Sequence, residues 1–457
     1  MCGSRKSALS RPPSTRPSAL TGSGGGNSVG RGDRPAHGET MMETITGAPA
    51  DRTLASIEVQ EDPYDYYDVL RDQAPVYYDP QLRVYIVSRY DLLMDAIRRT
   101  DVFSSIGSQA PAEMRAPPPE VKEIEKQGWP RVNTMVTNDP PSHTRYRKLV
   151  DYAFTPKRVK AMKPDMDDIV NLLIDRFIDR GEVELVSEFA VPVPLYVIAD
   201  QLGVPREDAP RFKTWSDASV APLGLMLSDE EWIDSARKVL EFQRYFVAAL
   251  DERRQRPCDD LLTALLQARA EGEKPLDTAE LLSIVSQVLV AGNETTTNSI
   301  AAGMTLLIDH PDQQRLLREE PGRIPTFVEE TLRLESAVQG LFRVVKEDTE
   351  LGGFAIPKGA RLMLRYAAAN RDGAKFASPH ELDVRRTNAG AHLAFGAGTH
   401  HCLGAQLARY EMIASFEAIL ARMDGLAYAG GRNSFRHHPH LCLRGLRELW
   451  LTFDRRT

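Results

Sequence analysis

One cysteine in a glycine-rich loop is the strongest chemical signal in this chain of 457 residues. Cys402 stands in residues 395–404, which read FGAGTHHCLG, and a helical pattern begins directly after them. Glycines permit tight turns and a close approach of backbone N–H groups to sulfur. The positive end of the following helix should favour the anionic thiolate. The loop is therefore suited to present a thiolate to a metal.

Three interpretations of this loop compete. A lone cysteine is often a small buried apolar residue, but that does not account for three glycines and two histidines around it. A zinc site made of His400, His401 and Cys402 would need ligand spacings that a contiguous tripeptide rarely supplies. A haem iron bound by the thiolate accounts for the cysteine and the glycines together.

At these positions the sequence resembles the cytochrome P450 family, whose haem-binding signature is Phe-Gly-x-Gly-x-His-x-Cys-x-Gly. The resemblance implies that Cys402 is the axial ligand of the iron in heme b (iron protoporphyrin IX) and that His400 binds a haem propionate. It also implies cofactor-binding roles for the other matched positions, which are Phe395, Gly396, Gly398 and Gly404. His401 falls on a variable position and, like His392, is assigned no role.

A second constellation places an acid and a hydroxyl side by side in an apolar helical stretch, at Glu294 and Thr295. On the residues alone, Thr295 could bond back to a carbonyl one turn earlier while Glu294 faces solvent or a salt bridge. The segment 291–295, AGNET, also resembles the oxygen-activation motif of the family. That resemblance implies that both residues are catalytic: Thr295 opens a local groove in the helix for dioxygen, and Glu294 carries protons inward.

Glu330 and Arg333 are three residues apart, which places both on one helix face. Taken alone, such a pair would be a solvent-exposed contact worth under about 1 kcal/mol. The resemblance instead implies the buried structural Glu-x-x-Arg pair of the family, closed by an arginine that precedes the cysteine loop. Arg386 is the matching candidate, and the three residues should hold the fold.

Haem propionates need cationic partners. His143 and Arg147 are four residues apart, on one face of a helix that begins after two prolines. Charged residues at such spacing are usually surface charge. The resemblance implies that both reach the haem carboxylates and that Arg343 is a further propionate-binding arginine, so that together they form an anion clamp.

The elements that position these residues are mostly helical. A disordered extension is expected at 1–44, and a single catalytic domain at 45–457. A hairpin is expected at 76–87, and 104–139 is a candidate access loop. The longest helix, 277–309, should run through the centre of a mainly α fold with small β-sheets, the cytochrome P450 fold, above the haem. Helical periodicity is found at 90–99, 163–179, 193–203, 230–254, 260–270, 277–309, 323–335 and 403–422.

Composition limits the partners. The chain has 57 Lys and Arg against 64 Asp and Glu, a formal charge of −7, so neither nucleic acid nor an anionic membrane is an expected partner. Its four cysteines are scattered, and no apolar run reaches about 18 residues, so we expect a cytoplasmic protein without a membrane span. A monomer is expected.

The resemblance implies a haem-thiolate monooxygenase that inserts one oxygen atom of O2 into a C–H bond of an apolar small molecule. The chain has no flavin or iron–sulfur motif, so electrons should come from a ferredoxin or flavodoxin with its NAD(P)H reductase. That partner is expected to dock near Arg145, Lys148 and Arg409. The expected substrate pocket is lined by Val288, Leu289, Ala291 and Val338.

Two alternatives remain open. A peroxide-using or isomerising haem-thiolate enzyme would need no redox partner, although the Glu294 and Thr295 pair argues against it. A haem sensor or carrier without catalysis would have no reason to keep an acid and a hydroxyl above the iron.

Overall fold

A long helix, α12 (Thr278–Asp309), passes through the described part of the chain. The computed structural model describes residues 52–108, 116–151, 154–224 and 227–456, so the predicted extension at 1–44 lies outside the described residues. A capping box begins α12: the Asp277 side chain accepts from the Glu280 N–H, and the Glu280 side chain accepts from the Asp277 N–H. The helix therefore starts and stops within one residue of the predicted 277–309.

The helices on either side of α12 follow most of the predicted ranges. Those before it are α1 (Ile57–Glu61), α2 (Tyr64–Gln73), α3 (Tyr90–Arg98), α4 (Pro119–Glu125), α5 (Ser142–Asp151), α6 (Pro156–Ala161), α7 (Lys163–Asp175), α8 (Pro192–Leu202), α9 (Ala209–Val220), α10 (Asp229–Gln255) and α11 (Leu261–Gln267). Those after it are α13 (Pro311–Glu319), α14 (Ile324–Leu334), α15 (Tyr366–Ala369) and α16 (Ala405–Arg422).

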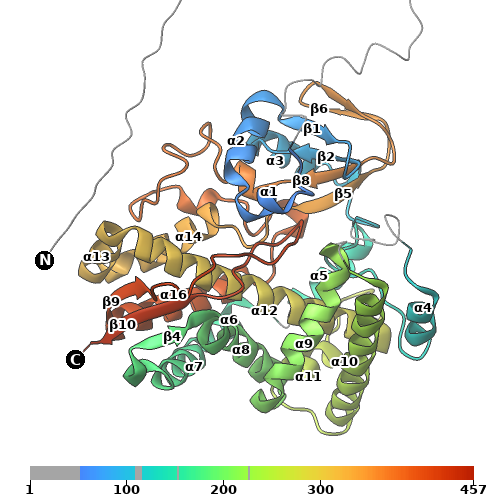
Figure 1. Ribbon diagram of the computed structural model, residues 1–457. Helices are drawn as coiled ribbons and strands as arrows, with labels where there is room; N and C mark the ends of the chain where they lie inside the picture. The colour runs from blue at the N-terminus through green and yellow to red at the C-terminus, as the bar shows by residue number, and fades with distance from the viewer. Residues whose placement is uncertain (1–51, 109–115, 152–153, 225–226, 457) are drawn as a thin grey trace, which may run out of the picture. The chain divides into compact units, whose positions relative to one another are not determined.

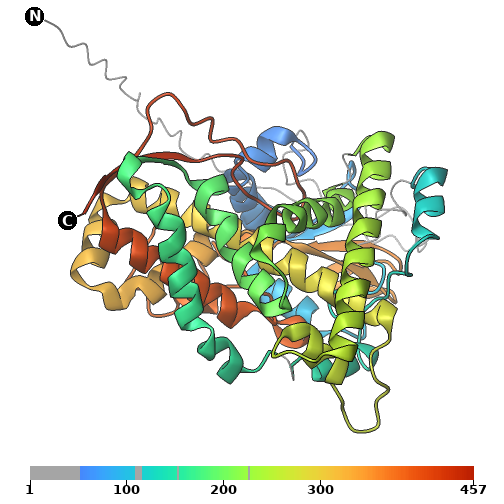
Figure 2. The same cartoon turned by 90° about the horizontal axis from the view of Figure 1, so that it is seen from below.

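Two core clusters explain the central place of α12. Its first half packs with α8 to α11, and its second half packs with α7, α14 and α16. In Figures 1 and 2, α12 (yellow) accordingly runs between the green helices and the orange and red ones. The contact with α16 depends on Gly303, because a Cβ there would lie 2.3 Å from Cζ of Phe416. The helix that carries Glu294 and Thr295 is thus fixed against the helix that follows Cys402.

The β structure is confined to small sheets. Strands β1 (Val76–Asp79) and β2 (Val84–Val87) form the predicted antiparallel hairpin. They continue into a five-stranded sheet of order β1-β2-β8-β5-β3, with β8 (Arg361–Leu364), β5 (Leu341–Val345) and β3 (Phe103–Ser104). A three-stranded sheet contains β4 (Glu182–Glu184), β10 (Trp450–Arg455) and β9 (Met423–Tyr428), and β6 (Thr349–Leu351) pairs with β7 (Phe354–Ile356). The mainly helical fold with small sheets is as predicted.

Three segments differ from expectation. Helix α7 ends at Asp175 rather than at 179, and the short 3₁₀ turn Ile178–Arg180 follows it. Helix α11 ends at Gln267 rather than at 270, because Ala268 leaves the helical region at ψ 128° and Gly272 follows with φ +76°. The predicted loop 104–139 contains the short helix α4, and its residues 109–115 lie outside the described residues. In the described ranges, every helix is too short or too polar to span a membrane.

Candidate functional site

The loop before α16 folds back on itself around Cys402. Gly396 and Gly398 have φ of +64° and +61°, a left-handed conformation that residues with a Cβ rarely adopt. The Cys402 N–H donates to the Phe395 carbonyl at 2.9 Å, which closes the loop. The sulfur therefore lies directly before the N-terminus of α16, as the sequence predicts.

Burial and nearby polar groups act in opposite directions on the Cys402 thiol. Burial raises the pKa of the thiol, whereas the Gly404 N–H and the charges of Arg147 and Arg409 lower it by less. The backbone at the start of α16 thus favours the anionic form, but burial outweighs it. A bound metal cation would supply the missing charge, since a coordinating thiol is deprotonated outright.

Cationic and imidazole side chains, two of them buried and two half-buried, converge next to this loop. The rings of His143 and His400 lie 4.5 Å apart, and Arg147 Nη1 donates to the His401 carbonyl at 3.0 Å. His400 Nε2 also lies 3.1 Å from Ser105 Oγ. Burial and the neighbouring Arg343 and His143 lower the pKa of His400 to about 3. The four predicted propionate partners are thus gathered around one site.

Two of these side chains have unused hydrogen-bonding capacity. His143 Nδ1 is buried without a partner. The 5% exposed Arg343 donates to the Phe342 carbonyl and, among the described residues, pairs with no carboxylate. Buried polar and charged groups normally find partners. The donors present therefore fit the carboxylates of a haem lying against the Cys402 loop.

One face of α12 carries the predicted pocket residue Ala291 and the predicted catalytic residue Thr295. Ala291 is exposed and Thr295 half-buried, although their helix is mostly buried in the core. The Thr295 hydroxyl donates to the Ala291 carbonyl at 2.8 Å, and α12 is an uninterrupted α-helix from Thr278 to Asp309. The predicted local opening of the helix is therefore not observed, because the hydroxyl bonds back within the helix.

Glu294 is directed to α9. Its Oε2 lies 3.5 Å from Nζ of Lys213, which also binds Asp217. Burial opposes the charge of Lys213, but Glu294 and Asp217 outweigh burial and raise its pKa. Among the described residues, Glu294 thus has one ion pair, which is long. Its partner Lys213 also pairs with the half-exposed Asp217.

The predicted substrate-pocket residues divide into two groups. Val288, Ala291 and Thr295 are spaced by three and four residues and share one face of α12. Leu289 lies on another face of α12 and is 1% exposed. Like Val288, which is 8% exposed, it belongs to the core cluster with α8 to α11. Val338 is half-buried and forms a backbone bridge with Leu443.

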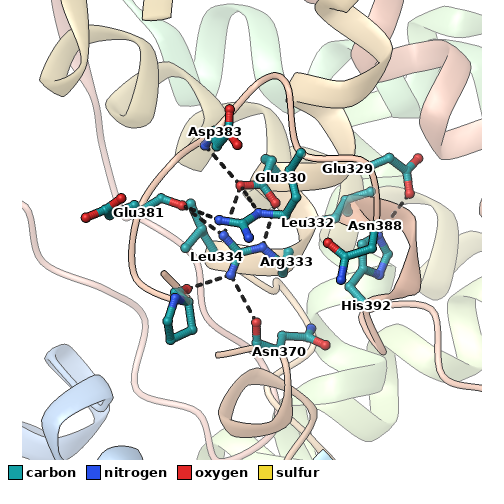
Figure 3. Close-up of polar contacts among 12 residues, drawn as sticks. Glu329, Glu330, Leu332, Arg333, Leu334, Asn370, Glu381, Asp383, Asn388 and His392 are labelled. Carbon is teal, nitrogen blue, oxygen red and sulfur yellow. Dashed lines mark hydrogen bonds and ion pairs between the residues drawn. The ribbon is translucent and has the colours of Figure 1, made fainter. Parts of the chain in front are cut away.

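The Glu-x-x-Arg pair is fully buried (Figure 3). Arg333 donates to both carboxylate oxygens of Glu330, at 2.6 and 2.9 Å, and Arg386 Nε donates to Oε2 at 3.0 Å. Arg333 also binds the carbonyls of Asn370 and Pro379, at 3.2 and 2.6 Å. The structure brings together the three residues as the sequence predicts, and they attach the segment before the cysteine loop to α14.

Some buried polar residues were missed by sequence reasoning. Glu411 on α16 is 2% exposed, and burial raises the pKa of its carboxyl to about 8 despite a hydrogen bond with Thr296. Asn293 is fully buried, and both its amide atoms lack a partner among the described residues. Neither has a spacing signal, because each is one polar residue within an otherwise ordinary helix.

Most of the basic residues that were expected to bind a redox partner form ion pairs within the chain. Arg145 pairs with Glu280 at 2.8 Å and with Glu273 at 3.6 Å. Arg409 pairs with Glu329. The predicted basic docking surface therefore loses two of its three charges to internal ion pairs. The zinc alternative is not assembled either, since the described residues contain no group of three His, Cys, Asp or Glu side chains able to hold a metal.

Known proteins resemble this chain over most of its length. The family model described as Cytochrome P450 matches residues 230–427. The 6-deoxyerythronolide B hydroxylase of Saccharopolyspora erythraea is 34% identical over 88% of this chain and 98% of its own length. The steroid C26-monooxygenase of Mycobacterium tuberculosis is 34% identical over 85% and 92%. The structure of CYP109Q5 from Chondromyces apiculatus is similar with a TM-score of 0.78 and 34% identity, covering 88% of this chain and 98% of that chain.

Proposed function

This chain belongs to the cytochrome P450 family and is a monooxygenase, and from that premise we propose that Cys402 binds the iron of heme b through its thiolate. The observation that carries the proposal is the closed Cys402 loop together with two buried side chains: Arg343, which pairs with no carboxylate among the described residues, and His143, whose Nδ1 has no partner. The bound haem would supply the activation of dioxygen and the insertion of one oxygen atom into a C–H bond.

The protein would hold the haem at two places, its propionates and its iron. Arg147, Arg343, His143 and His400 would bind the propionates, because charge-assisted hydrogen bonds to carboxylates are the strong ones. The turns at Gly396 and Gly398 bring the backbone around the sulfur, Phe395 holds the Cys402 N–H and Gly404 opens α16.

Proton delivery would depend on Glu294 and Thr295. The Glu294 carboxylate would receive protons through the solvent-accessible side of Lys213 and pass them towards the Thr295 hydroxyl. The Thr295 hydroxyl donates its one hydrogen to the Ala291 carbonyl. It must therefore rotate away from that carbonyl before it can donate into the site. General acid catalysis by such a group typically contributes about 10²-fold or more to a rate.

The substrate would be an apolar small molecule that lies against Val288, Ala291 and Val338. These side chains offer contact area and no charge, and they exclude water from the site. One relative is named for a steroid, which agrees with an apolar ligand. Electrons would come from a ferredoxin or flavodoxin with its NAD(P)H reductase. We place the protein in the cytoplasm as a monomer.

Reconstitution tests this function. The purified holoprotein is first screened with apolar ligands for the low-spin to high-spin shift of the haem. Ligands that shift the spectrum are then incubated with NADPH, a ferredoxin and its reductase, or with hydrogen peroxide alone. We expect hydroxylated product in the first reaction and little in the second. Product with peroxide alone would instead favour a peroxide-using enzyme, and no product under either condition would favour a haem sensor or carrier.

A further inference from the structure

Two neighbouring carboxylates on α14 serve different parts of the molecule. Glu330 is bound by Arg333 and Arg386, as described above. The side chain of Glu329 points away from that cluster and towards His392 (Figure 3). His392 follows the short 3₁₀ turn Ala389–Ala391 and precedes the Cys402 loop. Glu329 therefore connects α14 to the loop itself.

Glu329 is held from two sides. Arg409 on α16 binds it with both nitrogens of its fork, Nε to Oε1 at 2.5 Å and Nη2 to Oε2 at 3.0 Å. His392 Nε2 lies 3.1 Å from Oε2, and the Ala394 N–H donates to His392 Nδ1 at 3.2 Å. Burial opposes ionisation of Glu329, but His392 and Arg409 outweigh it and lower its pKa to about 2. The carboxylate is thus fixed and charged.

The same two partners enclose Phe395. The guanidinium carbon of Arg409 lies 4.6 Å from the centre of the Phe395 ring, a cation–π distance, and the His392 ring lies 5.6 Å from it. The carbonyl of Phe395 accepts the N–H of Cys402 at 2.9 Å. One connected set of contacts therefore runs from Glu329, through Arg409 and His392, to the residue that is hydrogen-bonded to Cys402.

We propose that Glu329, Arg409 and His392 are positioning residues that fix Phe395 beside the Cys402 loop, and that the balanced charges of Glu329 and Arg409 set the reduction potential of the haem iron. The proposal rests on the function above, in which Cys402 is the ligand. Hydrogen bonding and charge around a ligating sulfur tune the potential of its iron. The opposite charges of Glu329 and Arg409 largely cancel at a distance. In the wild-type protein the pair would therefore exert only a small electrostatic effect on the bound iron.

Charge variants give opposite predictions. Glu329→Gln leaves the Arg409 cation uncompensated, which favours the reduced iron and raises its reduction potential. Arg409→Gln leaves the Glu329 anion uncompensated and lowers it. We expect changes of order tenfold in the reduction equilibrium, equivalent to about 59 mV for one electron. The double variant should return towards the wild-type value. A merely structural loss would shift both single variants in the same direction.

The experiment is a spectroelectrochemical titration of the holoproteins, with the carbonyl spectrum of each reduced protein recorded in parallel. Asp179→Asn is the matched control, because this carboxylate is 75% exposed and pairs with Arg455 rather than with the loop. Potentials of both single variants within the scatter of that control, or shifted in the same direction, would overturn the proposal. A wild-type spectrum without thiolate character would instead overturn the proposed function on which it rests.

Discussion

The two sides of the candidate haem site hold their carboxyl groups in different ways. On the side of Cys402, Glu329 and Glu330 are each bound by a two-nitrogen arginine fork, with contacts of 2.5 to 3.0 Å. At α12, Glu294 has one ion pair at 3.5 Å. Glu411, which lies on α16 and faces Thr296 of α12, has a hydroxyl partner and no cation among the described residues.

This difference separates two tasks. A forked arginine fixes both the charge and the orientation of a carboxylate, which suits a framework that must keep a sulfur in place. A carboxyl with a weak or neutral partner can gain or lose a proton, which suits proton delivery or storage. The framework side should therefore respond to substitution mainly through stability and potential, and the α12 side through rates and pH dependence.

The largest effect is expected on the framework side. Glu330→Gln leaves Arg333 and Arg386 with buried, uncompensated charge, so the free energy of unfolding should fall by roughly 3–5 kcal/mol. Chemical denaturation of the holoprotein measures it, and the retained haem content gives a second readout if the variant is too unstable for a full curve. A loss below about 1 kcal/mol, with full haem content, would show that the pair behaves like a surface contact.

On the α12 side, Glu294→Gln should reduce the rate of product formation by about 10²-fold, equivalent to about 2.7 kcal/mol of barrier, while leaving folding intact. Turnover with saturating redox partner measures this rate, and the carbonyl spectrum checks the haem site. Glu294→Asp keeps the acid and should recover part of the rate. A Gln variant as fast as the wild type would remove Glu294 from proton delivery.

A more gradual effect, spread over several pH units, concerns Glu411. Burial raises the pKa of Glu411 to about 8 in the folded state from its ordinary value of 4.5, so between those values the folded state keeps a proton that the unfolded chain releases. The free energy of unfolding should therefore fall as pH rises through this window, by up to about 1.4 kcal/mol per pH unit, and level off above it. Denaturation curves of the wild type and Glu411→Gln measure the difference. Parallel pH profiles would contradict a neutral, buried Glu411.

The smallest effect belongs to the exposed pair of Arg455 and Asp179, which are 60% and 75% exposed. Asp179→Asn should change the free energy of unfolding by less than about 1 kcal/mol, and less still at high salt. Denaturation at low and high salt measures this. A loss as large as that of Glu330→Gln would mean that burial does not separate the two kinds of ion pair.

Sequence reasoning predicted most of the framework because its signals are local or repeat along the chain. The helical period located α12 within one residue, and the spacing of Glu330 and Arg333 placed them on one face. It could not weigh effects that depend on what surrounds a residue. Burial of the Cys402 thiol outweighs the groups that lower its pKa, and the Thr295 hydroxyl bonds back to the Ala291 carbonyl within an uninterrupted helix.

The spacing of residues along the sequence also did not indicate ion pairs between distant segments. Arg409 is basic and lies near the cysteine loop in the sequence, so it was expected to be free for a redox partner. Its partner Glu329 is 80 residues away in the chain. Only the packing of α14 against α16 brings the two together, and the same packing turns His392 from an unassigned residue into part of the loop's support.

The carbonyl spectrum of the reduced haem protein tests the central claim most directly. Wild-type protein, expressed with ample haem precursor, should show the red-shifted Soret band typical of a thiolate-bound carbonyl complex, and Cys402→Ala should lose it while the fold remains intact by circular dichroism. An imidazole-type spectrum in the wild type, or an unchanged spectrum in Cys402→Ala, would contradict the account.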